Sequence, residues 1–204
     1  MAFIDDLALE LFTLALVGVL AIYMTGMTYL QYRRSRNADV ESALYPGFFP
    51  LLVLGLFITV MGIYGEMTWP LPGSYNILFY DPYTLLGLII IGMAIAIYMK
   101  QKLQYVGIIA LFAGLMAIYY GYNAYLDHMT SSPIAMLGLY LAFGIAGVLT
   151  FPTTLIYDSL PGKQNVSKGW TVVLVLFWLA LVVASVLAAV TGILAVPQHL
   201  LAPP

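Results

Sequence analysis

Few side chains in this sequence could do chemistry, and most of them lie near the ends of long apolar runs. The 204 residues include nine acids, seven bases and two histidines, and they include no cysteine. One set of polar residues comes from several segments that are predicted to lie on the same side of the membrane. Its members are Glu10, Glu66, Asp81, Asn123, Asp127 and His128. Carboxylates with a histidine could bind a divalent cation or serve in acid–base chemistry.

Structural hydrogen bonding or solvation is the plainer interpretation of this set, with an ion or substrate site as the alternative and catalysis as a third. Asp127 and His128 are adjacent on a loop and need not point the same way, and no HExxH-type spacing supports a metal. Glu66 is the acid we expect to be partly buried and the first to test. The sequence predicts no metal and no cofactor, and it contains no nucleotide-binding loop or serine-hydrolase elbow.

The elements that must position these residues are membrane helices. Hydrophobic residues make up 63% of the chain and charged residues 8%, whereas soluble domains carry about 25% charged residues. Six apolar runs are long enough to cross the hydrocarbon core. They cover residues 7–30, 48–69, 83–99, 105–125, 134–157 and 170–194. The connectors are too short for a soluble domain, so residues 1–204 are predicted to form one all-α transmembrane domain, a six-helix bundle.

The basic residues predict the orientation of that bundle. All seven follow the first, third or fifth run: Arg33, Arg34, Arg36, Lys100, Lys102, Lys163 and Lys168. Because basic residues collect on the cytoplasmic side, this side faces the cytoplasm, and both termini face outward. The expected location is the cell membrane, with the lipid bilayer as the first partner and no role for nucleic acid.

Packing predictions follow from the small residues and the aromatic residues. Small residues recur every fourth position in the last three runs, which predicts a tight core among them. The larger residues Leu174, Phe177 and Trp178 are expected to meet lipid or a partner subunit. Most tyrosines are interpreted as interfacial. Proline at a first helical position loses no hydrogen bond, so Pro82 and Pro133 are expected to start the third and fifth helices.

Two short patterns recur in register along the chain. "LFITVMGIY" (56–64) matches "LFAGLMAIY" (111–119), and "PYTLLGL" (82–88) matches "PIAMLGL" (133–139). These matches link the even and the odd runs, so they suggest helical hairpins repeated in the same orientation. Chance similarity between leucine-rich segments is the alternative.

The segment Tyr45–Pro50 raises a different question, because it sets two prolines and a glycine at the start of an apolar run. We interpret Tyr45, Pro46, Gly47, Phe49 and Pro50 as an interfacial elbow. Proline within the first turn of a helix costs little, since the missing N–H has no intrahelical partner. The elbow could also serve as a docking edge.

Residues 45–83 carry two family resemblances. The blocks "YPGFFPLLVLGLF" and "GIYGEMTWPLPGSYNILFYDPY" resemble a largely archaeal family of small multi-pass membrane proteins of unknown function, which implies a fold and no activity. "YPGFFPLLVLGLFITVMGIY" is also similar to the small membrane subunit of tripartite tricarboxylate transporters. This chain has Tyr45 where that family has glycine, and six runs where about four are expected. That resemblance implies support of a larger transport subunit.

Three functions remain open from the sequence. The leading hypothesis is an accessory or scaffold subunit of a membrane complex, related to transport, with a membrane-protein partner or a second copy of the chain. The alternative is an autonomous small transporter or channel with a cation or substrate site on the acidic outer side. A membrane enzyme at the outer interface is third, and we lean away from it. It would need Glu66, Asp81, Asp127 and His128 to converge.

Overall fold

The computed structural model describes residues 6–35, 39–161 and 166–201, and these segments contain only helices and their connections. The helices are α1 (Asp6–Arg34), α2 (Val40–Leu44), α3 (Phe48–Thr68), α4 (Ser74–Tyr98), α5 (Gln104–Leu126), α6 (Pro133–Ser159) and α7 (Lys168–Leu201). A 3-10 turn, η1 (Tyr45–Gly47), joins α2 to α3. Six of the helices are long and apolar enough to cross a membrane, which confirms the predicted fold class. The chain is therefore a multi-pass membrane protein.

One predicted helix start is wrong. Pro82 lies inside α4, because the helix already begins at Ser74, within what was predicted to be a connector. Buried Asn76 explains the early start: its amide donates to the Gly65 carbonyl of α3 and accepts from the Leu71 N–H. The link fixes the turn between α3 and α4. Pro133, by contrast, does stand at the first position of α6, as expected.

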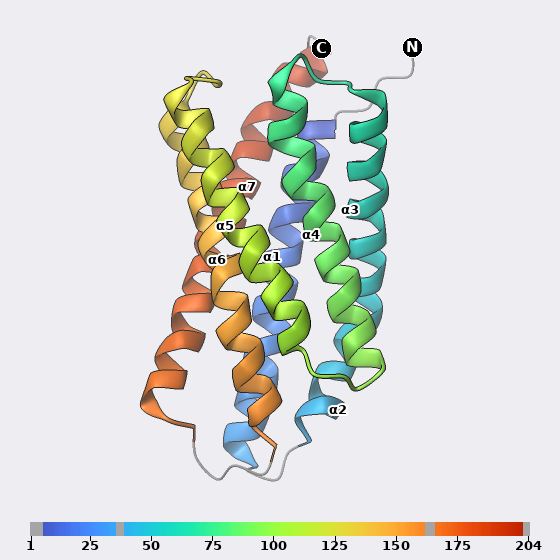
Figure 1. The fold of residues 1–204 in the computed structure, drawn as a ribbon, viewed down its shortest axis with the longest axis vertical. Coiled ribbons are helices and arrows are strands. Elements are labelled where there is room, and N and C mark those ends of the chain that lie inside the picture. Colours follow the sequence, from blue (N-terminus) through green and yellow to red (C-terminus); the bar gives the residue numbers. More distant parts are fainter. Residues whose placement is uncertain (1–5, 36–38, 162–165, 202–204) are drawn as a thin grey trace.

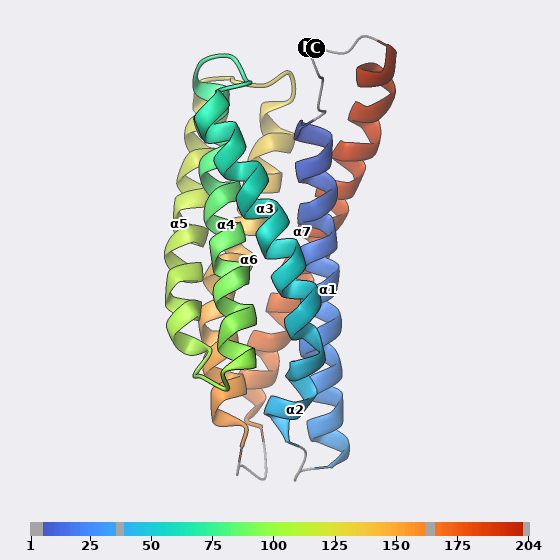
Figure 2. The ribbon, with the colours of Figure 1, turned by 90° about the vertical axis from the view of Figure 1, so that its right-hand side faces the viewer.

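The six long helices form a closed ring in which each packs against two neighbours. The order around the ring is α1, α7, α6, α5, α4, α3, and the contact between α3 and α1 that closes it is a small one. Figures 1 and 2 show the helices running along the long axis, with the start of α1 and the end of α7 at the same end. We call this the terminal end, and the opposite end the basic end.

The two most extensive contacts are between α5 and α6 and between α3 and α4. The contact between α5 and α6 is extensive because their backbones approach each other directly. A Cβ on Gly114 would lie 2.5 Å from the Gly144 carbonyl oxygen. Glycine lets membrane helices approach this closely, and dispersion contacts then hold them together. The tight α5–α6 pair agrees with the predicted core of small residues. Both pairs are sequential hairpins, although common ancestry between them stays a prediction.

Two predictions about side chains at the bundle surface are wrong. Leu174 and Phe177 of α7 are buried instead of facing lipid, and Trp178 is half-buried and donates to the Thr25 hydroxyl of α1 at 2.9 Å. Several tyrosines assigned to the interfaces are also buried: Tyr29, Tyr32, Tyr80 and Tyr83. A tyrosine inside the bundle needs a partner for its hydroxyl. Tyr29 bonds with Thr171 of α7, and Tyr83 bonds with Thr13 of α1.

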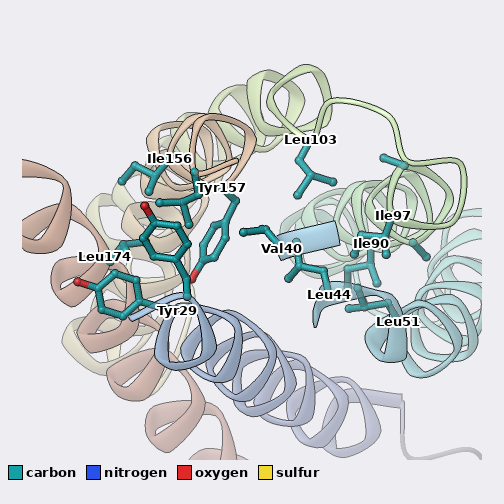
Figure 3. Close-up of a cluster of buried hydrophobic side chains, with 14 of the residues drawn as sticks. Tyr29, Val40, Leu44, Leu51, Ile90, Ile97, Leu103, Ile156, Tyr157 and Leu174 are labelled. Carbon is teal, nitrogen blue, oxygen red and sulfur yellow. The ribbon is translucent and has the colours of Figure 1, made fainter. Parts of the chain in front are cut away.

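The short helix α2 closes the basic end of the ring. Its Val40 and Leu44 are buried and extend into the middle of the ring, between side chains of α4 and α6 (Figure 3). Asp39 caps α2 by accepting from the Glu41 and Ser42 N–H groups. Hydrogen bonds from the Ser42 hydroxyl and these backbone groups lower the pKa of Asp39 below its usual value, so the cap is charged at neutral pH.

The elbow after α2 is a helical turn. Pro50 lies in the first turn of α3, where a missing N–H costs little, as expected. Gly47 packs against Met24 of α1 so closely that a Cβ would overlap it. Phe48 and Tyr98 pack with their tilted rings 4.8 Å apart between centroids, while Tyr45 and Phe49 are exposed. The elbow is thus built for packing against α1 and α4, and its role as a docking edge stays a prediction.

The basic residues within the described ranges do gather at one end. Arg33 and Arg34 end α1, Lys100 and Lys102 lie in the α4–α5 turn, and Lys168 begins α7. Arg36 and Lys163 lie outside the described residues. Asp158 of α6 caps α5 at this end, because its carboxylate accepts from the Leu103 and Gln104 N–H groups, both at 2.9 Å.

Three tyrosine hydrogen bonds brace the ring across its interior. Tyr83 of α4 bonds with Thr13 of α1 (2.7 Å), Tyr140 of α6 donates to the Leu78 carbonyl of α4 (2.5 Å), and Tyr157 of α6 donates to the Thr25 carbonyl of α1 (2.6 Å). None of these helix pairs is adjacent in the ring. The hydroxyls therefore connect α1, α4 and α6 in a triangle that backbone packing does not make.

Pro82 explains why the Tyr140 hydroxyl donates a hydrogen bond to a backbone carbonyl. Proline has no N–H, so the carbonyl four residues earlier loses its intrahelical partner. That carbonyl belongs to Leu78, and the Tyr140 hydroxyl takes the place of the missing N–H. An unsatisfied carbonyl inside a membrane protein costs on the order of several kcal/mol. Pro82 and Tyr140 therefore act together, because the tyrosine satisfies the carbonyl that the proline leaves without a donor.

We expect Tyr140→Phe to lower the free energy of unfolding by about 1–2 kcal/mol, since it leaves the Leu78 carbonyl without its donor. In a Pro82→Ala background the helix regains its own donor, so the same substitution should cost close to nothing. A double-mutant cycle by thermal unfolding in mild detergent measures this coupling. Tyr105→Phe, at an exposed position, is the control. Equal costs in both backgrounds would show that the two residues are not coupled.

Candidate functional site

A cavity of about 430 Å³ runs through the middle of the ring. All six long helices and the end of α2 contribute to its wall, and most of the lining is aliphatic or aromatic. Small-molecule sites occupy about 300–1,000 Å³ and are lined by apolar groups with a few polar ones. The cavity lies between opposite helices of the ring, so it follows from the architecture.

The cavity is long. On α1 it extends from Leu7 to Thr25, which is about 27 Å at 1.5 Å per residue. That length nearly equals the hydrocarbon thickness of about 30 Å.

Glu10 lies at the terminal end of this cavity and is 4% exposed. The nearby helices contribute two tyrosines to the same region, Tyr83 and Tyr140, and the Glu10 carboxyl is close enough to interact electrostatically with both. Thr13, one turn further along α1, bonds with Tyr83. Glu10 is the one acid or base among the described residues that line the cavity.

The half of the cavity toward the basic end is lined by hydroxyl groups from α6 and α1. The sequence "TFPTT" (150–154) places three threonines around Pro152, and all three line the cavity. Thr150 donates to the Ala146 carbonyl and Thr154 to the Phe151 carbonyl. Thr153 is 2% exposed, and its hydroxyl makes no hydrogen bond with any described residue.

A second polar cluster lies outside the cavity, between α3, α4 and α5. The carboxyl groups of Glu66 and Asp81 are within hydrogen-bonding reach of each other, and Tyr120 donates to the Asp81 carboxylate. Both carboxyl groups are half-buried, and neither lines the cavity. Two carboxylates this close repel, so a proton or a cation between them is needed to hold the contact.

The remaining members of the predicted polar set do not join this cluster. Asn123 donates to the Tyr119 carbonyl of its own helix. Asp127 and His128 are exposed after the end of α5. No group of three or more acids or histidines with metal-binding geometry occurs among the described residues, and the side chain of His199 is outside that description. The structure therefore brings Glu66 and Asp81 together and places Glu10 apart from them, in the cavity.

Sequence reasoning missed the residues that matter most to the cavity. Tyr140 and Thr153 carried no motif, and Tyr83 was interpreted as interfacial. The available signals were Pro82 within a helix, which implies an orphan carbonyl at Leu78, and three threonines around Pro152 in an apolar run. Neither signal says which other helix faces these groups.

We expect Glu66→Gln to raise the free energy of unfolding by about 0.5–1 kcal/mol, because the amide can donate to Asp81 without the proton that the carboxyl pair must otherwise take up. Thermal unfolding at neutral pH in mild detergent measures this change. Glu41→Gln, at an exposed position of α2, is the control. Destabilisation by Glu66→Gln would instead mean that a cation, which an amide cannot replace, bridges the two carboxylates.

The chain matches one family model, described as a protein of unknown function (DUF981), over residues 1–202. It therefore belongs to that family. No curated protein and no solved structure matches the chain. The expected links to archaeal proteins and to a tripartite transporter subunit are not among these findings and stay predictions.

Proposed function

We propose that this protein, a member of a family without an assigned activity, binds a lipid-like molecule in its central cavity and acts as a membrane carrier or transporter of that molecule. The observation that carries the proposal is the cavity of about 430 Å³, which extends through most of the ring between α1, α4 and α6. Its apolar wall suits a hydrocarbon chain.

An accessory subunit is the second candidate, favoured by the Glu66–Asp81 cluster. Ionisable residues in membrane helices are costly, and they usually face a partner, an ion or a cavity. This pair is half-buried at the side of the bundle, away from the cavity. A membrane partner or a second copy that covers α3, α4 and α5 would complete it. The enzyme hypothesis has no such support, because Asp127 and His128 are not joined to the pair.

A cavity-filling substitution tests the proposed function. Proteoliposomes that contain the protein are treated with hexadecanol carrying a photoreactive diazirine on its chain, and crosslinked residues are mapped by mass spectrometry. We expect crosslinks at cavity-lining residues of the wild-type chain. Ala113→Trp fills the cavity from α5 and should reduce these crosslinks about tenfold or more, the loss that steric exclusion by an indole would produce.

Leu115→Trp is the matched control, because Leu115 lies on the same helix but is half exposed at the bundle surface. It should leave the cavity crosslinks unchanged. Crosslinks confined to surface residues of the wild-type chain would overturn the proposed function. Loss of cavity crosslinks in both variants would point to general unfolding, which far-ultraviolet circular dichroism measured on the same samples distinguishes.

We also propose that the terminal end faces outward and the basic end faces the cytoplasm, since all seven bases follow the first, third or fifth helix. The native chain has no cysteine, so single cysteines report their side of the membrane without a background signal. Ser131→Cys, in the exposed α5–α6 connection, should react with an impermeant maleimide on intact cells. Gln101→Cys, in the exposed α4–α5 turn, should react only after the cells are opened. The reverse pattern would invert the topology.

A further inference from the structure

We infer that the molecule in the cavity enters and leaves sideways, through an opening between the terminal halves of α6 and α7 that faces the hydrocarbon of the membrane. The inference rests on the proposed function and adds the source of the ligand, which is the bilayer and not the water. It depends on where α6 and α7 separate, on the side chains that close the other sides of the ring, and on the residues that border the opening.

The helices α6 and α7 pack against each other near their middles. Ala146 of α6 is buried in one cluster with Phe177 and Leu181 of α7, and Leu149 packs against that cluster. Gly138 precedes Leu149 by eleven residues, which is about three turns, so the two lie on the same side of α6. A Cβ on Gly138 would meet nothing within 4 Å. The contact with α7 therefore ends before Gly138, and the terminal ends of the two helices are apart in both Figure 1 and Figure 2.

Over its terminal half α7 packs on α1 instead. A Cβ on Gly18 of α1 would overlap the Ser185 hydroxyl oxygen of α7. A Cβ on Gly192 of α7 would lie 3.3 Å from the Cβ of Leu11 in α1. Glycines allow helices in a membrane to approach this closely. The C-terminal half of α7 thus follows α1 and departs from α6.

Buried side chains close the other sides of the ring. One cluster joins α1, α2, α3 and α4 with the basic ends of α6 and α7. A second joins the terminal ends of α4, α5 and α6, and it includes Leu78, Ala124 and Tyr140. Among the described residues, no such cluster joins α6 to α7 on the terminal side of Leu181. The space between the terminal halves of these two helices is therefore the side of the ring that side chains leave open.

The residues at this side show that the cavity reaches the surface there. Thr191 of α7 lines the cavity and is also exposed. Leu11 of α1 and Phe143 of α6 line the cavity and are partly exposed. The opening begins beyond Leu181 and extends at least to Thr191, ten residues along α7, which is about 15 Å at 1.5 Å per residue.

The opening faces hydrocarbon and not water. Both helices that border it are among the six that are long and apolar enough to cross a membrane. Residues 133–149 and 181–197 contain no charged side chain, and the exposed residues near the opening are apolar, as at Val190 and Leu194. A charged or strongly hydrated molecule would lose its water on this route at a high cost in free energy. A lipid-like molecule in the bilayer has no such water to lose.

The rate at which a bound probe leaves tests the opening. The purified protein is loaded with the diazirine hexadecanol in mild detergent and then diluted into an excess of unlabelled hexadecanol. Light flashes at intervals record how fast the cavity crosslinks decline. Thr191→Trp places an indole in the opening from the α7 side, and we expect it to slow this decline about tenfold, equivalent to about 1.4 kcal/mol in the barrier to exit.

Val190→Trp is the matched control. Val190 is the neighbour of Thr191 on α7, it is 48% exposed, and it is not among the described residues that line the cavity. The indole at this position points into the lipid, so the rate of decline should equal that of the wild-type chain. Gly138→Trp narrows the opening from the α6 side, where a new side chain meets open space, and it should slow the decline as Thr191→Trp does.

The proposed function and the route of entry fail in different ways. If the wild-type chain shows no cavity crosslinks, the proposed function fails, and the route fails with it. If cavity crosslinks form but decline equally fast in Thr191→Trp, Gly138→Trp and Val190→Trp, the cavity binds the molecule and the sideways route is wrong. Slower decline in all three variants would also overturn the route, because an indole that faces lipid should not affect it.

Discussion

Three tyrosine hydrogen bonds across the ring are the interactions on which the rest of this structure depends. In hydrocarbon, helices gain little from burying apolar surface against each other, so close packing and hydrogen bonds must hold a bundle together. Close packing here joins neighbours around the ring, most of all α5 with α6 and α3 with α4. The bonds from Tyr83, Tyr140 and Tyr157 join the opposite walls, α1, α4 and α6. They limit the distance between walls that are not neighbours in the ring.

That distance determines the cavity. If α1, α4 and α6 packed directly against each other, the interior would be filled by side chains. A tyrosine hydroxyl instead reaches from one wall to a polar group on the other, and space is left beside each tyrosine side chain. The same residues that satisfy polar groups in lipid thereby line the candidate binding site. The contacts that stabilise the bundle therefore also shape the candidate site.

The two acidic sites differ in what surrounds them. Glu10 lies inside the cavity with Tyr83 and Tyr140 near it, so its surroundings are those of a small-molecule site. Glu66 and Asp81 lie between helices at the side of the bundle, with Tyr120 donating to Asp81. The first arrangement suits a ligand within the ring. The second suits a proton, a cation or a partner at the surface, so the chain offers two separate places for function, both toward the terminal end.

Much of the architecture followed from the sequence, for a physical reason. The length of an apolar run reports the thickness of the bilayer, so six helices could be counted and most of their ends placed within a few residues. Pro50 and Pro133 were placed correctly, because a proline near a helix start is a local signal. Pro82 was not, because its place inside α4 depends on Asn76 bonding to Gly65 of another helix. Leu174 and Phe177 were assigned to the wrong face, since lipid and protein interior are equally apolar.

The sequence by itself determined that this chain is an all-helical membrane protein with six spans and its bases after alternate spans. Hydrophobicity and charge are properties of each residue, so the membrane spans can be predicted without knowing which residues are in contact. Only the tertiary structure decided that the spans form a ring around a cavity, and that Glu10 and not Glu66 lines it. These facts depend on which helices face each other, and a uniformly apolar helix carries no stripe that marks its inner face.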